Sequence, residues 1–268
     1  MTLSVVIITH NEEANIARTL SSVQPLVSGE GEIIIVDCGS TDRTVEIAQS
    51  YGAKVFAEAW KGYAAQKNFA LDKASGDWIL SLDADEEVES DLAAELANAV
   101  SRVGSPAGYW ISRKNFFLGR WIRHGGYWPD PKMRLFRRGM ARFEDRAVHE
   151  DAHLTEGIAG HLKGSLLHHS YPTLADYLDH MNRYSSLGAE MAAAKGKARF
   201  SFFNIVLRPA ATFIYNYTFR LGFLDGHEGL LLHLNHAVYV SWKYAKAWEL
   251  ARNGQAQTSP PQQEGFVD

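Results

Sequence analysis

The strongest constraint on the fold is an alternation of strand-like and helix-like segments over the first hundred residues. Leu3–Ile8 and Glu32–Val36 are short apolar runs rich in β-branched residues, which is typical of strands buried on both faces. Between them, Glu13–Leu26 has apolar residues at helical spacing. The pattern continues with expected helices at 43–51 and 62–74 and expected strands at 54–57 and 78–82. Such alternation predicts a mostly parallel sheet with helices on both faces.

Polar and acidic clusters follow three of the expected strands. They are His10–Glu12, Asp37–Asp42 and Asp83–Asp85. The carboxyl ends of parallel strands lie at one edge of a sheet, and ligands bind beyond that edge in α/β proteins. We therefore expect the three clusters to form one ligand site.

The second half of the chain has a different pattern. Strands are expected at 109–117 and 132–137, and helices at 174–194, 200–221 and 227–252. We expect an α/β domain at 1–170, a helical extension at 171–252, and a disordered tail at 253–268, which is rich in Gln, Pro and Ser. A length of 268 residues suits this division.

Cysteine content and hydropathy indicate the compartment. Cys38 is the one cysteine, which excludes an intrachain disulfide and fits a reducing cytoplasm. The first apolar run has no basic leader, so we expect a strand there and no signal peptide. Charged residues interrupt the apolar stretches of the C-terminal third before they reach the length of a membrane span. We expect a cytoplasmic protein.

Charge is unevenly distributed along the chain. Residues 1–100 contain 17 acidic and 6 basic residues, whereas residues 113–146 contain 10 basic and 3 acidic residues. The basic segment indicates either a solvated face or a surface for phosphate-bearing substrates or anionic lipids. The chain as a whole has a net charge of −4 and no nucleic-acid recognition motif, so we expect no nucleic-acid partner.

Asp83 and Asp85 directly follow an apolar strand. Alternate residues of an extended chain point to opposite sides, so a shared ligand requires a turn at this point. Two carboxylates there suit Mg²⁺ or Mn²⁺ bridging a diphosphate. A solvated turn, or acids at the start of a helix, explains the tripeptide alone equally well.

Four motifs in order resemble the inverting glycosyltransferases of family 2, which have the GT-A fold. The matching segments are Val5–Glu12, Val36–Asp42, Gln66–Asn68 and Leu82–Asp85. The later segments Val148–Glu150 and Gly222–Gly226 are similar to the branch that adds β-linked glucose to heptose of the lipopolysaccharide inner core. The resemblance implies a GT-A-like, Rossmann-like sheet. It also implies UDP-glucose as the donor and a glycolipid acceptor. Because such an acceptor is lipid-anchored, we expect peripheral attachment to the inner face of the cytoplasmic membrane.

The resemblance also implies roles for individual residues. Asp37 is expected to accept a hydrogen bond from the base, which favours uracil, and Asp85 is expected to hold the metal. The residues expected to bind the nucleotide sugar are Thr9, His10, Glu12, Asp37, Lys67 and Asp83.

An inverting transfer needs a general base that takes the proton of the acceptor hydroxyl. The position of Glu150 relative to the family motif makes it the candidate, with Asp151 as the alternative. Either residue could instead be a surface acid. His149, Glu150 and His153 also match the zinc-hydrolase pattern HExxH, but their surroundings lack a helical apolar stripe. Two further alternatives are transfer to a polyprenyl phosphate and a sugar-nucleotide-binding module without turnover.

Two surfaces are candidates for acceptor and membrane contact. Aromatic residues that stack on sugars and arginines that hold phosphates are mixed in the segment 113–137, where the arginines are Arg113, Arg120, Arg123, Arg134 and Arg137. In the last helix, Tyr239, Trp242 and Trp248 accompany Lys243 and Lys246, which fits either a helix lying on a membrane or one packed on the domain.

Overall fold

The computed structural model describes residues 1–144, 151–196 and 199–258. Its strands are β1 (Leu3–Thr9), β2 (Glu32–Asp37), β3 (Lys54–Ala57), β4 (Trp78–Asp83), β5 (Glu86–Val88), β6 (Gly108–Phe117), β7 (Arg120–Trp121), β8 (Pro131–Arg137), β9 (Ala141–Phe143), β10 (Ala152–Leu154) and β11 (Ala159–Tyr171). Its α-helices are α1 (Ile16–Val23), α2 (Thr44–Ser50), α3 (Tyr63–Lys73), α4 (Ser90–Ser101), α5 (Leu174–Ala194), α6 (Arg208–Ile214) and α7 (Gly226–Thr258). Short 3₁₀-helices are η1 (Gln24–Val27) and η4 (Gly222–Asp225), and the π-helical segments are η2 (Phe203–Leu207) and η3 (Tyr215–Phe219).

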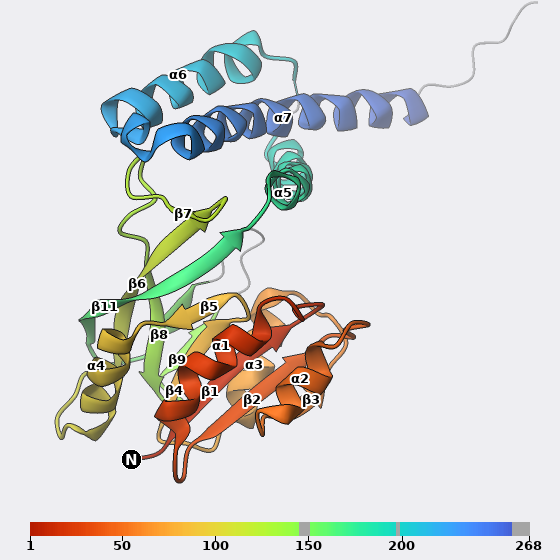
Figure 1. Ribbon diagram of the computed structural model, residues 1–268. Coiled ribbons are helices and arrows are strands. Elements are labelled where there is room, and N and C mark those ends of the chain that lie inside the picture. The colour runs from red at the N-terminus through yellow and green to blue at the C-terminus, as the bar shows by residue number, and fades with distance from the viewer. Residues whose placement is uncertain (145–150, 197–198, 259–268) are drawn as a thin grey trace, which may run out of the picture. The chain divides into compact units, whose positions relative to one another are not determined.

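One twisted sheet organises the first part of the chain (Figure 1). Its strand order is β3-β2-β1-β4-β8-β6-β11-β5, with β7 paired to β6. The four N-terminal strands are parallel, as the alternating pattern predicts, and Val5 of β1 lies between Ile33 and Leu80. β8 joins antiparallel to both β4 and β6, so the sheet as a whole is mixed.

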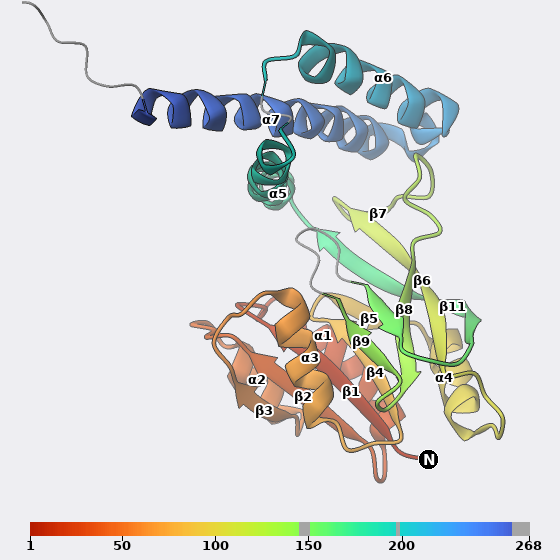
Figure 2. The same ribbon diagram turned by 180° about the vertical axis from the view of Figure 1, so that it is seen from behind.

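Helices cover both faces of this sheet, as expected. One face packs apolar side chains of β1, β2 and β4 against α1, α2 and α4, with Leu20 and Leu92 fully buried. The other face packs against α3 and the small sheet formed by β9 and β10. Figure 1 shows α1 in front of the parallel strands. Figure 2 views the same strands from the opposite side and shows α3 in front of them.

β5, α4 and the long strand β11 are not among the elements expected from the sequence. β11 contains glycines and histidines and lacks an apolar run, so periodicity does not reveal it. It forms because it fills the space between β6, to which it is parallel, and β5, to which it is antiparallel. Gly164 lets it pass close to α4, since a Cβ there would lie 2.6 Å from the Cα of Leu92.

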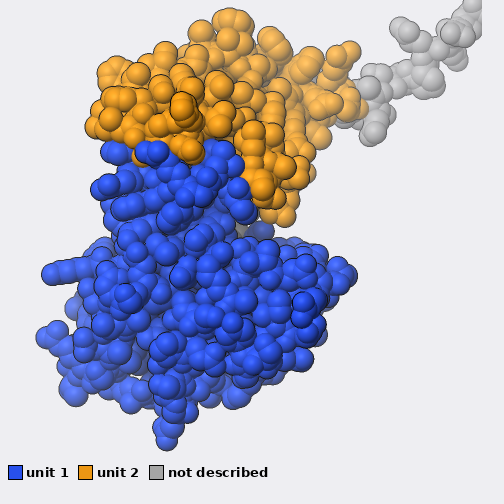
Figure 3. Space-filling view, viewed as in Figure 1, with its two compact units in different colours: residues 1–172 blue, residues 173–268 orange. Residues whose placement is uncertain are grey.

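The chain divides into two compact units, residues 1–172 and 173–268 (Figure 3). The first contains every strand listed above. The second begins with a capping box in which Thr173 and Asp176 exchange hydrogen bonds at the start of α5. α7 runs past residue 252 to Thr258, so the first part of the tail that we expect to be disordered is helical.

The two lysines of α7 that could contact a membrane, Lys243 and Lys246, face α5 instead. The Nζ atom of Lys246 donates to the carbonyl of Asn182 at 2.8 Å and to the hydroxyls of Ser185 and Ser186. Lys243 lies against Gly188, where a Cβ would meet its side chain at 3.1 Å. Of the two interpretations of this helix, the structure therefore supports packing. Within the described residues, no helix combines the length and apolarity needed to cross a bilayer.

Candidate active site

The loops that follow β1 and β2 are locked together by hydrogen bonds. The backbone N–H of Asn11 donates to Ser40 Oγ at 2.8 Å, and its side-chain oxygen accepts from the N–H of Thr41 at 2.8 Å. The N–H of Glu12 donates to Thr44 Oγ1 at 2.7 Å. Asn11 adopts a left-handed backbone (φ 56°), which Asn tolerates better than most residues. The two loops therefore form one preorganised edge.

Asp37 holds the second loop in shape. Its Oδ2 accepts from the N–H groups of Gly39 and Ser40, both at 2.9 Å, and its Oδ1 accepts from Thr9 Oγ1 at 3.0 Å. Burial by itself would raise the pKa of Asp37, but these hydrogen bonds outweigh it and lower the pKa. The carboxylate is thus ionised and stabilises the loop that it belongs to. Its hydrogen bond to the nucleobase stays a prediction.

His10 and Glu12 stand at the same edge. His10 is exposed, and Glu12 is half-buried with its Oε2 accepting from Asn15 at 2.9 Å. Burial raises the pKa of Glu12, and the negative charges of Asp85 and Asp83 add to this effect. The first loop and the acidic tripeptide therefore share one electrostatic environment, as the strand-end argument predicts.

The turn required by the tripeptide is present at Ala84 and Asp85, between β4 and β5. The buried hydroxyl of Thr19 donates to the carbonyl of Ala84 at 2.7 Å. The N–H of His169 donates to the carbonyl of Asp85 at 3.1 Å. Helix α1 and strand β11 thus hold the turn from two sides and position its carboxylates.

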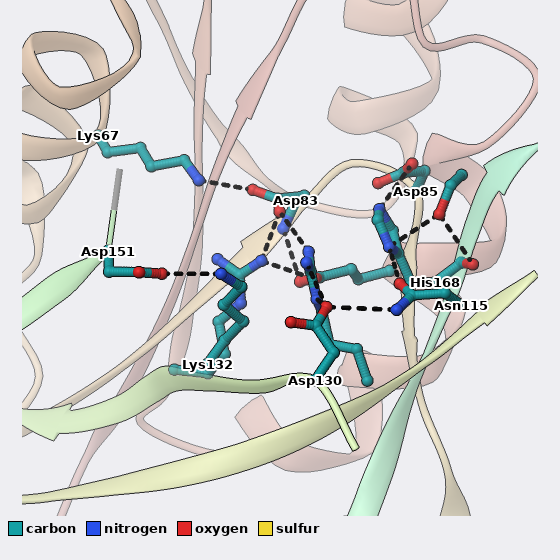
Figure 4. Close-up of polar contacts among 12 residues, drawn as sticks. Lys67, Asp83, Asp85, Asn115, Asp130, Lys132, Asp151 and His168 are labelled. Carbon is teal, nitrogen blue, oxygen red and sulfur yellow. Dashed lines mark hydrogen bonds and ion pairs between the residues drawn. The ribbon is translucent and has the colours of Figure 1, made fainter. Parts of the chain in front are cut away.

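Asp83 lies among three cations. Lys67 Nζ is 2.8 Å from its Oδ1, Arg134 is hydrogen-bonded to its Oδ2, and Arg113 approaches to 3.7 Å. Figure 4 shows Lys67 reaching Asp83 from the side opposite Asp85 and His168. Burial favours the neutral acid, but Arg134, Lys67 and Arg113 hold the pKa of Asp83 well below its usual range. Lys67 and Asp83, both expected to bind the nucleotide sugar, therefore lie together.

A buried ion network supports this arrangement from below. Glu86 is fully buried, accepts from the N–H of Asp83 at 3.0 Å, and binds Arg113 and Arg134 at 3.2 and 2.6 Å. Asp130 completes the network by pairing with Arg113 at 2.6 Å. Three cations face three carboxylates here, so the buried charges are compensated.

Asp85 pairs with a histidine instead of a lysine or arginine. His168 Nε2 lies 3.3 Å from Asp85 Oδ2 (Figure 4). Burial opposes the charge on Asp85, but His168 outweighs it and the pKa of Asp85 is lowered. Asn115 determines which nitrogen of the ring carries the proton. Its amide nitrogen faces two acceptors, the Tyr127 carbonyl and Asp130, both at 3.3 Å.

The amide oxygen of Asn115 therefore faces His168 Nδ1, at 2.6 Å. Because that oxygen is an acceptor, Nδ1 must donate, and in the neutral ring the lone pair of Nε2 points toward Asp85. A histidine whose second nitrogen is held by a carbonyl in this way is arranged as a metal ligand is. Asp85 and His168 thus offer an oxygen and a nitrogen to one ion.

The residues fit a divalent metal that is completed by its substrate. The described part of the chain has no group of three His, Cys, Asp or Glu side chains that could hold an ion unaided. Mg²⁺ is usually held by one or two carboxylates together with substrate phosphates and water. Asp85, with His168 beside it, matches that requirement, whereas both oxygens of Asp83 are already bound to cations.

The candidate base Glu150 lies outside the described residues, as does His149. Its alternative, Asp151, pairs with Lys132 Nζ at 2.9 Å (Figure 4). Burial would raise the pKa of Asp151, but Lys132 outweighs it and lowers the pKa, which makes Asp151 a weaker proton acceptor than an unpaired aspartate. His153 lies in strand β10. The zinc-hydrolase pattern requires its second histidine on a helix, so the structure contradicts that alternative.

The structure also corrects the expected acceptor surface. Arg134 is buried and Arg113 nearly so, and both belong to the ion network around Asp83. An aromatic cluster remains near β7. Trp121 and Trp128 meet edge to face with ring centroids 5.3 Å apart, and Arg123 lies over Trp121 at 4.7 Å. These side chains keep the combination of ring faces and a cation that suits a phosphorylated sugar.

Sequence reasoning leaves His168 without a role and misses its support, Asn115. The doublet His168–His169 is visible in the sequence, but nothing local connects it to Asp85. The connection arises because β11 lies beside both β5 and β6, which puts His168 opposite Glu86 and Asn115.

A mixed α/β sheet with a carboxylate turn and cations at its strand ends suits a phosphate-bearing ligand. The profile of Glycosyl transferase family 2 matches residues 4–155. The chain is 33% identical to the lipopolysaccharide core biosynthesis glycosyltransferase LpsC of Rhizobium meliloti, with 92% of each chain covered. It is 30% identical to an uncharacterised glycosyltransferase of Rickettsia typhi, over 93% of this chain and 87% of that one.

The protein is a glycosyltransferase, and it belongs to glycosyl transferase family 2. Among solved structures, the mannosyltransferase PcManGT of Pyrobaculum calidifontis, in complex with GDP-mannose and Mn²⁺, is similar. It has a TM-score of 0.55 at 17% identity, over 92% of this chain and 87% of that one. This likeness confirms the expected GT-A-like fold.

Proposed function

We propose that the enzyme transfers a hexose, glucose from UDP-glucose, to a lipopolysaccharide-core or related glycolipid acceptor with inversion at the anomeric carbon. The observation that carries the proposal is the placement of Asp85 and His168 next to Asp83 and Lys67, at the edge formed by the two interlocked loops. Thr9, His10, Glu12 and Asp37 would face the nucleoside there. The similarity to LpsC supports the acceptor class.

Mg²⁺ or Mn²⁺ would be held by Asp85, with His168 as a second ligand. When bound, the metal would neutralise charge on the departing nucleoside diphosphate. Lys67 is nearly buried and already paired with Asp83, so it has little freedom to move. A diphosphate that arrives beside Asp83 would meet this lysine in place, which lowers the cost of ordering it.

The acceptor hydroxyl would lose its proton to Glu150. Asp151 is the less suitable base, because Lys132 holds it ionised and lowers its pKa. A glycolipid acceptor lies in a membrane, so we propose that the protein works at the inner face of the cytoplasmic membrane as a peripheral protein. Transfer to a polyprenyl phosphate is the second candidate, since a phosphate oxygen would need no base.

Binding and turnover test the proposal together. The purified full chain is screened against UDP-, GDP- and dTDP-hexoses by calorimetry, with Mn²⁺, with Mg²⁺ and with chelator. The best donor is then incubated with core oligosaccharide lipids and with polyprenyl phosphate, and the anomeric configuration of the product is read by NMR. We expect metal-dependent binding of UDP-glucose and a β-linked glycolipid product. Binding without turnover on any acceptor would favour the non-catalytic module.

Two matched variants test the base. We expect Glu150→Gln to lower kcat about 1000-fold while UDP-glucose binding is retained, because the base acts on the acceptor and not on the donor. Asp151→Asn, the same change at the neighbouring position, should lower kcat by less than about tenfold. The reverse order of the two variants would assign the base to Asp151.

A further inference from the structure

The helical segment from Phe203 to Phe219 exposes residues with a strict four-residue period. Phe203, Leu207, Ala211, Tyr215 and Phe219 are each exposed, and so is the residue before each of them. None of these ten positions carries a charge. We call these ten positions the outer face. Phe203 and Phe219, near its two ends, are 62% and 75% exposed. The outer face is therefore a continuous apolar stripe open to solvent.

The two π-helical segments keep this stripe straight. An α-helix has about 3.6 residues per turn, so a four-residue repeat drifts roughly 40° per step and roughly 160° from Phe203 to Phe219. π-helical turns contain more residues, so the same repeat drifts the other way within them. η2 and η3 lie at the two ends of the stripe, on either side of α6. Their presence cancels the drift, so one face stays apolar along the whole segment.

The opposite side of this segment packs on α7, which lies alongside it in both views (Figures 1 and 2). Ser241 Oγ donates to the carbonyl of Ile205 at 2.8 Å, and Pro209 is buried. Arg208 Nη1 donates to the Tyr244 hydroxyl at 2.7 Å. The segment 203–219 and α7 form a helical hairpin, which the inner side of the segment holds together. This packing does not explain why the outer face is apolar.

The turn that follows extends the apolar surface. Leu221 adopts the left-handed backbone region (φ 60°) and is exposed, as is Phe223. A bulky residue costs free energy in this region, where glycine is usual. The chain thus keeps a leucine at the tip of the hairpin, where its side chain meets solvent.

Charge identifies what would cover this surface. Between Glu190 and Asp225 the sequence contains no acidic residue and five basic ones: Lys195, Lys197, Arg199, Arg208 and Arg220. Arg199, Arg208 and Arg220 are exposed and lie before, within and after the stripe. An apolar aromatic face on a segment that carries cations and no acids is the pattern of helices that lie in the surface of an anionic bilayer.

We propose that the outer face, together with the Leu221–Phe223 tip, inserts into the headgroup region of an anionic membrane. Lys243 and Lys246 of α7 are not the contact, because they pack on α5. The proposal rests on the membrane attachment proposed above and names the surface responsible. Its test needs neither the donor, the metal nor the acceptor.

Flotation of the full chain with vesicles tests the proposal. The vesicles contain equal parts of phosphatidylglycerol and phosphatidylcholine, or phosphatidylcholine alone. We expect binding to the anionic vesicles that weakens in high salt, and a roughly 100-fold lower partition coefficient for Phe203→Asp/Phe219→Asp, about tenfold for each ring. The matched control is Val103→Asp/Ile158→Asp, which charges two exposed apolar residues of the first unit. It should bind as wild type does.

A second readout needs no disruptive change. Cys38 is the one cysteine, so an environment-sensitive dye can be placed at position 219 or 103 in a Cys38→Ser background. We expect a blue shift on adding anionic vesicles for Phe219→Cys and none for Val103→Cys. Any of four outcomes would overturn the proposal. They are that the wild type does not float with anionic vesicles, that Phe203→Asp/Phe219→Asp floats as well as the wild type, that Val103→Asp/Ile158→Asp loses as much binding as that variant, and that the dye at position 219 shows no blue shift.

A second copy of the chain could cover the outer face instead of a membrane. In that case sedimentation velocity without lipid would show a dimer that Phe203→Asp/Phe219→Asp dissociates, and the same variant would float as the wild type does. This result would also overturn the proposal. Failure of the proposed activity is separate, because the vesicles carry neither donor nor glycan. Calorimetric binding of UDP-glucose by the double variant, expected to equal wild type, keeps the two questions apart.

Discussion

At the scale of single residues, the site depends on carboxylates whose partners differ. Asp83 is neutralised by Lys67 and Arg134, while the direct partner of Asp85 is the imidazole of His168. The two acids of one tripeptide therefore have different chemistry. Asp83 is fixed within an ion network, whereas the partner of Asp85 is a side chain that could bind a metal ion together with it.

The first prediction concerns this metal site and uses neighbouring histidines as a matched pair. Asp85→Asn should lower metal-dependent turnover at least about 100-fold, because it removes the ligand charge. His168→Gln should weaken Mn²⁺ binding, read by electron paramagnetic resonance with UDP present, by about 10–100-fold. His169→Gln is the control, since His169 contacts Glu87 at 3.2 Å instead. Equal Mn²⁺ affinity in the two histidine variants would remove His168 from the metal site.

At the scale of elements, one glutamate ties several strands together at the end of the sheet away from the site. Glu32 of β2 accepts from Ser4 of β1 at 2.7 Å, pairs with Lys54 of β3 at 2.7 Å, and accepts from the N–H of Ser75 at 2.7 Å. Burial opposes its charge, but Lys54, Ser75 and Ser4 lower the pKa of Glu32 to about 2.

The second prediction follows from this pKa. A lowered carboxylate pKa stabilises the fold above the unfolded-state value of 4.5, and the contribution disappears as the pH falls toward about 2. We therefore expect Glu32→Gln to lower the free energy of unfolding in urea by about 2 kcal/mol near neutral pH and by much less near pH 3. Glu46→Gln, in an exposed ion pair with Arg43, should leave the free energy of unfolding nearly unchanged at either pH. A loss for Glu32→Gln that is constant with pH would contradict this account.

At the scale of the whole molecule, acidic groups set the pH range of stability. The pKa values of Asp37, Asp83, Asp85 and Asp130 are also lowered, each because hydrogen bonds or cations outweigh burial. Glu12 acts in the opposite direction, since its raised pKa adds stability as it becomes protonated. More of these carboxylates have a lowered pKa than a raised one, so their protonation on balance favours the unfolded chain.

The third prediction is an acid-sensitive fold. The melting temperature measured by calorimetry should be nearly constant from about pH 8 to pH 7 and should fall progressively below about pH 6. The fall begins because His233, whose pKa burial lowers to about 4, must take up a proton, and it continues as the carboxylates are protonated. Asp83→Asn should be destabilised at neutral pH, because it leaves the buried cations Lys67 and Arg134 without their carboxylate. A melting temperature that rises on acidification would show that repulsion among the acids of the first hundred residues dominates instead.

The sequence by itself determined the parallel half of the sheet and the strand ends that carry the site, because strand and helix periodicities are local properties of short segments. It also identified the turn at Asp85 and the length of α5. Only the tertiary structure placed His168 beside Asp85, moved Arg113 and Arg134 from an expected acceptor surface into the ion network, and turned Lys246 toward α5. These outcomes depend on which strands and helices become neighbours. That choice is made by packing between segments distant in sequence, which no local pattern records.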